Sequence, residues 1–89
     1  MWKFSKHAIT RLNERGFSED HILMVLKEKI PSIVLLSPRE ESVDLYFSKI
    51  VSRYILIVVD KNSHTVITAR PMRKKEKLAF IKEMENEQQ

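Results

Sequence analysis

Cations gather where an apolar strand is expected to run into the C-terminal helix. Along the stretch from Thr65 to Lys77 they are Arg70, Arg73, Lys74, Lys75 and Lys77. A helix N-terminus already carries partial positive charge, so acidic side chains are the stabilising choice there. Cations added to free backbone N–H groups instead make a site for anions, of which phosphate is the obvious candidate. The alternative is a solvated basic face that tolerates a small penalty.

His7 is the histidine best suited to proton transfer. In a helix it shares a side with Arg11, four residues later, and this neighbouring charge favours the neutral imidazole that a general base needs. The structural alternative is a histidine that bonds locally at the start of a helix. We expect His21, in a first helical turn, and His64, in a hairpin turn, to be ordinary surface residues.

The chain offers little for metal binding. No two of its three histidines have the spacing of metal ligands, its carboxylates form no cluster suited to magnesium, and it has no cysteine. We therefore expect neither a metal nor another cofactor.

Composition limits the remaining options. The 89 residues suit one domain, residues 1–89, and 43% hydrophobic with 31% charged residues is typical of a globular protein. The net charge of +4 is compatible with a polyanionic partner. The longest apolar run, Tyr54 to Val59, is too short to span a bilayer, and the N-terminus lacks the apolar region of a signal peptide. The expected location is the cytoplasm, without a membrane partner.

Two helices are predicted in the first third. Ser5 is a good N-cap, and Gly16, the single glycine, is expected to end the first helix in a Schellman motif with a contact between Leu12 and Phe17. The apolar stripe of this helix is Ala8, Ile9 and Leu12.

Ser18 can cap the second helix, and Pro31 is expected to end it. Its buried stripe is Ile22, Val25 and Leu26.

From Ser32 onward the apolar period changes from 3.6 to 2, which predicts strands. The expected strands are Ile33 to Leu36, Val43 to Lys49, Tyr54 to Val59, and the run that starts at Thr65. Alternation places Val43, Leu45 and Phe47 on one face and Asp44, Tyr46 and Ser48 on the other, which we expect to be open. In the last strand Ile67 and Ala69 suit the core, which puts Val66, Thr68 and Arg70 on the opposite face.

The final helix is expected to bury Leu78, Phe80, Ile81 and Met84. The fold class is therefore α+β: two N-terminal helices, a mostly antiparallel sheet of about four strands, and a C-terminal helix.

Two similarities together cover nearly the whole chain. Lys6-His7-Ala8, Arg11, Glu14-Arg15-Gly16 and Ser18-Glu19 resemble the opening of a widespread family of small uncharacterised bacterial domains, which begin with a His-Ala, Arg, Glu-Arg-Gly pattern. The remainder, on Ser48 to Arg53 and on Ile67 to Arg70 with Arg73 and Glu76, is similar to BrnT-type toxins of the RelE/ParE superfamily.

Basic positions that flank the central hairpin of that family are matched by Lys49 and Arg53. Such proteins often have glycine between these cations, whereas this chain has Ile50-Val51-Ser52. The direction in which the two cations point is therefore left open by the sequence.

The resemblance implies a RelE-like fold and metal-independent RNA cleavage. Such cleavage needs a base for the ribose 2′-OH, cations for the phosphate oxygens and an acid for the leaving 5′-oxygen. Arg70 is the expected phosphate contact, because its fork matches phosphate geometry, and Arg53 or Lys49 assists. Tyr46 on the open face could stack a base or donate a proton, its structural alternative being a half-exposed sheet aromatic. His7 is the candidate base.

Three functions from different classes stay open. They are a metal-independent ribonuclease toxin, a ParE-like toxin that binds a protein target, and a non-toxic module that binds nucleic acid or protein on the same scaffold. The expected partners are RNA, free or on the ribosome, and a cognate antitoxin; a homodimer is compatible with the sequence. The expected nucleic-acid contacts are Lys49, Arg11, Arg73, Lys74 and Lys75. Tyr46, Arg53 and Arg70 on one face would favour the ribonuclease.

Overall fold

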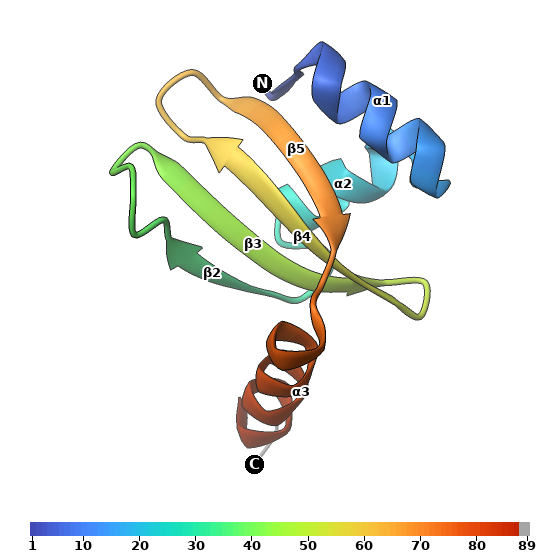
Figure 1. Ribbon diagram of the computed structural model, residues 1–89, viewed down its shortest axis with the longest axis vertical. Coiled ribbons are helices and arrows are strands. Elements are labelled where there is room, and N and C mark those ends of the chain that lie inside the picture. Colours follow the sequence, from blue (N-terminus) through green and yellow to red (C-terminus); the bar gives the residue numbers. More distant parts are fainter. Residues whose placement is uncertain (88–89) are drawn as a thin grey trace.

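The computed structural model describes residues 1–87, with three helices and five strands in an α+β arrangement (Figure 1). The predicted fold class is confirmed, with one strand more than expected. In chain order the elements are β1 (Lys3–Phe4), α1 (Lys6–Arg15), α2 (Glu19–Leu26), β2 (Ser32–Leu36), β3 (Val43–Ile50), β4 (Arg53–Asp60), β5 (Thr65–Pro71) and α3 (Lys74–Glu87).

The strands form one mixed sheet in the order β1-β5-β4-β3-β2. The pairs from β2 to β5 are antiparallel, whereas β1 runs parallel to β5. The central strand β4 is apolar on both faces, as the sequence predicts for a strand covered on two sides. The extra strand β1 holds only Lys3 and Phe4, which is too short for a period-2 pattern to reveal.

The first two helices begin and end largely as their sequences predict. Ser5 and Ser18 accept hydrogen bonds from backbone N–H groups three residues later, which confirms both N-caps. Gly16 has a φ of 72°, and the N–H of Phe17 donates to the carbonyl of Leu12 at 2.9 Å, as a Schellman motif requires. The prediction that Pro31 ends the second helix is wrong.

That helix, α2, ends at Leu26, five residues before Pro31. Glu28 adopts a left-handed φ of 62°, and the N–H of Lys29 donates back to the carbonyl of Met24 at 2.8 Å. A left-handed residue therefore closes the helix without glycine, which the sequence pattern does not reveal.

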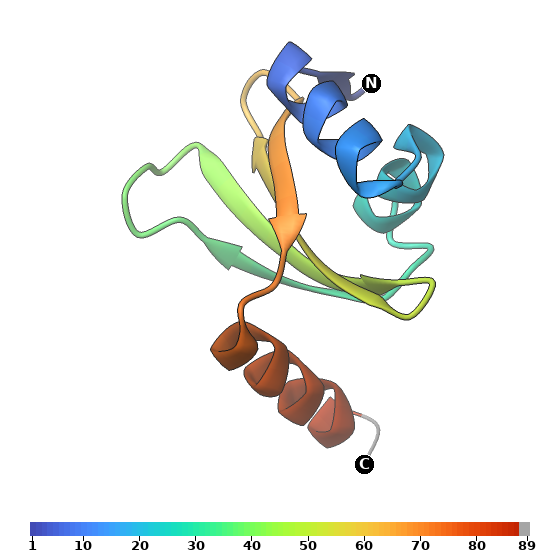
Figure 2. The ribbon, with the colours of Figure 1, turned by 45° about the vertical axis from the view of Figure 1, so that its right-hand side comes forward.

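Both N-terminal helices pack on one face of the sheet, whereas α3 leaves the end of β5 toward the other side (Figures 1 and 2). Below, the two faces are called the α1/α2 face and the α3 face. The buried core lies on the α1/α2 face, where Leu12 and Ile22 from the helices meet Ile55, Ile57 and Val59 of β4. The prediction that Ile9 belongs to this core is wrong, because its side chain is exposed.

The alternation predicted for β3 is confirmed and Val43 is buried as predicted, but the prediction that the other face is open is wrong. Tyr46 and Ser48 pair with Ile57 and Ile55 and therefore lie on the α1/α2 face. Phe47 lies on the α3 face, opposite Leu56. Alternation of apolar and polar residues predicts which residues share a face of a strand, but it does not predict which face the helices cover. Here α2 covers the less apolar face of β3.

A register shift in β5 moves Val66 into the core. Val59 pairs with Val66 while Val58 pairs with Thr68, so Ile67 is the extra residue between them. Val66 and Ala69 are both buried, contrary to the prediction that they lie on opposite faces. A strict period of 2 cannot anticipate such a bulge. Arg70 pairs with Leu56 and lies on the α3 face.

The helix α3 packs through fewer residues than predicted. Phe80 is buried and meets the ring of Tyr54 edge to face, with 6.0 Å between ring centroids. Ile81 and Met84 are half-buried, and the predicted burial of Leu78 is wrong, because it is 57% exposed. None of the helices within residues 1–87 is long and apolar enough to cross a membrane.

Candidate functional site

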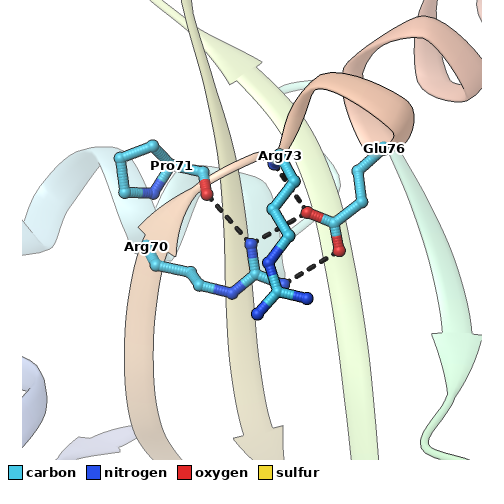
Figure 3. Close-up of polar contacts among 4 residues, drawn as sticks. All are labelled: Arg70, Pro71, Arg73 and Glu76. Carbon is cyan, nitrogen blue, oxygen red and sulfur yellow. Dashed lines mark hydrogen bonds and ion pairs between the residues drawn. The ribbon is translucent and has the colours of Figure 1, made fainter.

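Arg70 is held by a carboxylate at the junction of β5 and α3. Its two terminal nitrogens donate to the two carboxylate oxygens of Glu76, each at 2.8 Å, in a bidentate pair (Figure 3). One of these nitrogens also donates to the carbonyl of Pro71 at 3.0 Å. Most of the guanidinium fork that was expected to meet phosphate is therefore occupied within the protein.

The same carboxylate caps the helix. Glu76 is the third residue of α3 and accepts the N–H of Arg73 at 2.7 Å (Figure 3). This is the return half of a capping box, in which the third helical residue reaches back to the residue before the helix. An acidic side chain thus lies at the positive end of the helix dipole, and the expected anion site there already has an internal anion.

Electrostatics at the junction follow from this geometry. The hydrogen bond from Arg70 is the main cause that lowers the pKa of Glu76, and the N–H and charge of Arg73 lower it further. The hydrogen bond to Glu76 raises the pKa of Arg70 in turn. Each side chain of the pair thus favours the ionised form of the other.

Cations in the first turn of α3 diverge instead of converging. Lys75 lines a groove against Ile33 and Leu35 of β2, whereas Lys77 lies over the ring of Tyr54, 4.8 Å from its centroid. Lys74 is exposed. The run of basic residues therefore does not make a single anion site.

Tyr46 lies on the α1/α2 face, half-buried against the core. This corrects the prediction that it shares an open face with Arg70, which lies on the other side of the sheet. Burial raises the pKa of Tyr46, and the charges of Asp44 and Glu28 raise it further. A phenol that holds its proton more tightly than usual is a weaker acid for a leaving group.

Arg53 extends over the ring of Phe17, with 4.0 Å between the guanidinium carbon and the ring centroid. Phe17 follows the Schellman ending of α1, so the fold places an aromatic ring directly beside the start of β4. A guanidinium that lies over a ring face keeps its charge, and its free N–H groups can bind a phosphate oxygen.

Lys49 and Lys77 both approach Tyr54. Lys49 is the cross-strand partner of Tyr54, and its ammonium nitrogen lies 5.5 Å from the ring centroid. Lys77 reaches the same ring from α3. Together with Arg53 and Phe17, these residues form what we call the basic–aromatic end of the sheet.

The turn at this end is strained. Val51 and Ser52 form a two-residue hairpin loop, with φ of 48° and 69°. Positive φ at both positions is typical of a type I′ turn, which favours Asn-Gly. A β-branched residue is costly in this conformation, and the side chain of Val51 is 73% exposed, so burial gives no compensation. The turn fixes the register that places Lys49 opposite Tyr54.

Within the part of the chain that the structure describes, the cations of the basic–aromatic end form no ion pair with a carboxylate. Among the described residues, ion pairs join Arg11 to Glu14, Lys61 to Asp44 and Arg70 to Glu76. None of these involves Lys49, Arg53 or Lys77. Arg53 and Lys77 instead line a shallow hollow of about 270 Å³, whose other walls are Phe17, Ser52, Tyr54, Pro71 and Met72.

Two further predicted site residues lie on α1. His7 is exposed, and no side-chain hydrogen bond is recorded for it within residues 1–87. Arg11 pairs with Glu14 at 3.1 Å. The structure thus brings Lys49 and Arg53 to the same end of the sheet, whereas Arg70 is engaged elsewhere and Tyr46 faces the core.

Sequence reasoning missed three residues of this end, namely Phe17, Tyr54 and Lys77. A signal for Tyr54 was present, since a two-residue turn at Val51-Ser52 makes Lys49 and Tyr54 opposite neighbours. The positions of Phe17 and Lys77 depend on how α1 and α3 dock, which no local pattern contains.

Nothing in the described part of the chain gathers three or more His, Asp or Glu side chains as a metal site would. Comparison of the chain with protein-family models, with curated proteins and with solved structures finds no match. The family resemblance stays a prediction, and the functional argument depends on the geometry described above.

Proposed function

We propose that this protein binds single-stranded RNA through its basic–aromatic end and does not cleave it. The observation that carries the proposal is a set of three cations, Lys49, Arg53 and Lys77, which are held against aromatic rings and form no ion pair within residues 1–87. RNA is the form of nucleic acid expected from the resemblance to BrnT-type toxins. A toxin role and a cognate antitoxin remain part of that expectation.

The chemistry of this end suits a single strand. Cations supply contacts to successive phosphates, and aromatic rings beside them supply apolar surface, which is the combination that binds single strands with little sequence preference. The hollow beside Arg53 and Lys77 is lined by Phe17, Tyr54 and Met72. A base can enter it while its phosphate contacts the two cations at the rim.

Fewer observations support RNA cleavage than RNA binding. A transition state for metal-free cleavage needs base, acid and phosphate contact within reach of the same phosphate. Arg70 and Tyr46 lie on opposite faces of the sheet, and the fork of Arg70 is occupied by Glu76. The arrangement therefore favours RNA binding over RNA cleavage.

The experiment compares two triple variants that remove equal charge. One is Lys49→Gln/Arg53→Gln/Lys77→Gln at the basic–aromatic end; the matched control is Lys3→Gln/Lys6→Gln/Arg39→Gln, which removes two lysines and one arginine from exposed positions elsewhere. Binding of a fluorescent, unstructured RNA is measured by anisotropy at several salt concentrations. Loss of three phosphate contacts should make the log–log salt slope shallower by about 2 and lower the affinity about 100-fold at low salt.

The control should retain most of the affinity, because long-range attraction changes equally in both variants. Equal losses in the two variants would contradict the proposal and leave only unspecific charge attraction. The same RNA, incubated with EDTA and resolved on a denaturing gel, should stay intact. Fragments that appear with the wild type but not with Arg70→Ala would restore the ribonuclease hypothesis.

A further inference from the structure

A second surface of the molecule is unusual because it exposes adjacent apolar residues on an edge strand of the sheet. β2 lies at one edge of the sheet, and no other strand of residues 1–87 lies beyond it (Figure 1). Val34, Leu35 and Leu36 are 46%, 53% and 67% exposed. The three residues lie on both faces, since Val34 and Leu36 point to the α1/α2 face and Leu35 to the α3 face.

Proteins usually protect such an edge. Charged side chains, internal proline or a very short strand prevent pairing with another chain. The opposite edge follows this rule, because β1 has only two residues. β2 has five residues, Ser-Ile-Val-Leu-Leu, without a charge or a proline. The edge is therefore open to a further strand.

Hydrogen-bond alternation identifies which backbone groups are free. Just after β2, the N–H of Ser37 donates to the carbonyl of Val43 at 2.9 Å, so these two residues form a hydrogen-bonded pair. In an antiparallel ladder the backbone N–H and C=O groups of successive residues point alternately toward the two sides of the strand. Ile33 and Leu35 therefore direct these groups toward β3, as Ser37 does. The outward groups belong to the even-numbered residues Ser32, Val34 and Leu36. No hydrogen bond recorded outside the ladders in residues 1–87 involves these outward groups.

We propose that two copies of this protein associate through antiparallel pairing of their β2 strands, with Val34 on the two-fold axis. In this register Val34 faces Val34 of the second copy, and Ser32 faces Leu36 in both directions. All three outward residues then meet outward residues, so every free N–H and C=O of the edge finds a partner. The two sheets become one continuous sheet of ten strands.

Self-pairing suits this strand chemically. It has no charge, so the two-fold axis brings no like charges into contact within the strand. Side chains on opposite residues also match by face, since Ile33 meets Leu35 on the α3 face. Proline at positions 31 and 38 bounds the pairing segment, because Pro38 has no N–H to offer beyond Leu36.

An apolar groove beside the edge extends the contact. It measures about 520 Å³ and is floored by Ile33, Leu35 and Phe47, with Ala79 and Phe80 of α3 on its wall. In the paired form, the same residues of the second copy continue this floor across the axis. A five-residue strand pair is nevertheless a small interface, and we expect the association to be weak.

The first experiment is sedimentation equilibrium over about 5 μM to about 1 mM, a range that brackets a weak interface of this size. Wild-type protein should approach twice the monomer mass at the upper end. Val34→Lys places two ammonium groups in contact across the axis, and this should weaken association at least about 30-fold. The control Leu78→Lys adds the same charge at an exposed position of α3 and should associate like the wild type.

A charge exchange tests the register itself. Val34→Glu alone should also be monomeric, but an equimolar mixture with Val34→Lys should form heterodimers, because Glu and Lys then meet on the axis. A wild type that stays monomeric up to about 1 mM, or a mixture that stays monomeric, overturns the proposal. A monomeric wild type would leave the edge to a strand of another protein.

Cross-linking gives a readout for variants that fold poorly. The chain has no cysteine, so Val34→Cys introduces a single thiol. Opposite residues of a hydrogen-bonded pair have Cα atoms about 5.5 Å apart, within the range of a disulfide. Mild oxidation should cross-link Val34→Cys much faster than Leu78→Cys. Equal rates would contradict pairing through β2.

Discussion

Two regions of the molecule hold cations, and they differ in what surrounds those cations. At the junction of β5 and α3, the fork of Arg70 is occupied by Glu76, which also caps the helix. At the basic–aromatic end, Lys49, Arg53 and Lys77 lie over ring faces. A ring attracts a cation without neutralising it, whereas a carboxylate cancels its charge.

This difference suggests that the junction arginine serves the fold and the ring-bound cations serve a partner. Arginine at a strand-to-helix junction looks functional in the sequence because it matches a family pattern. In this structure Arg70 instead links the end of β5 to the first turn of α3 through Glu76. The residues better placed to bind phosphate are those whose surroundings orient them but leave them charged.

The strained turn offers the largest expected change in stability. Replacing Val51-Ser52 by Asn-Gly removes two costly backbone conformations, at about 1 kcal/mol each, so the free energy of unfolding should rise by about 2 kcal/mol. Urea denaturation of both proteins measures this difference in the free energy of unfolding. RNA affinity should be unchanged, because the flanking cations keep their register. A loss of affinity would show that Val51 itself touches the RNA.

A pair of alanine substitutions separates the two groups of cations directly. Arg70→Ala breaks a bidentate, partly buried ion pair and should cost about 1.5 kcal/mol of stability while leaving RNA affinity nearly intact. Arg53→Ala removes an exposed cation, so it should change stability little and weaken RNA binding about 5-fold. Thermal unfolding and anisotropy measure both quantities on the same samples. The reverse pattern would assign RNA contact to Arg70.

Much of the fold was predictable because local chemistry determines it. The capping serines and Gly16 mark helix ends by their own hydrogen bonds, and the apolar β4 marks the centre of the sheet. The α1/α2 face of β3 was predicted wrongly because Tyr46 and Ser48 are less apolar than Phe47, and only the docking of the helices decides which face is covered. The basic–aromatic end was partly missed for the same reason, since Lys77 reaches Tyr54 through tertiary packing.

The smallest of the predicted effects is the loss of stability at the Arg70–Glu76 pair in acid. Because the pKa of Glu76 is lowered in the folded protein, its ionised form contributes stability above the ordinary glutamate pKa, and this contribution is lost as pH falls through the folded value. At pH 7, Glu76→Gln should be less stable than wild type by about 1 kcal/mol, and the difference should shrink below about pH 4. Urea denaturation across this range measures it. The control Glu40→Gln, in an exposed loop, should show no such difference, and a constant gap for Glu76→Gln would mean that the hydrogen bonds, and not the charge, matter.

The contact of β1 and α1 with β5 has a consequence for synthesis on the ribosome. β1 pairs with the start of β5, the hydroxyl of Ser5 donates to the carbonyl of Ile67, and Arg15 donates to the carbonyl of Ala69. Both β1 and α1 precede β5 in the chain, so they can complete their packing only after β5 has been made. A nascent chain that lacks β5 would leave α1 without its main partner and both edges of a partial sheet open, which is the state in which chaperones would be most needed.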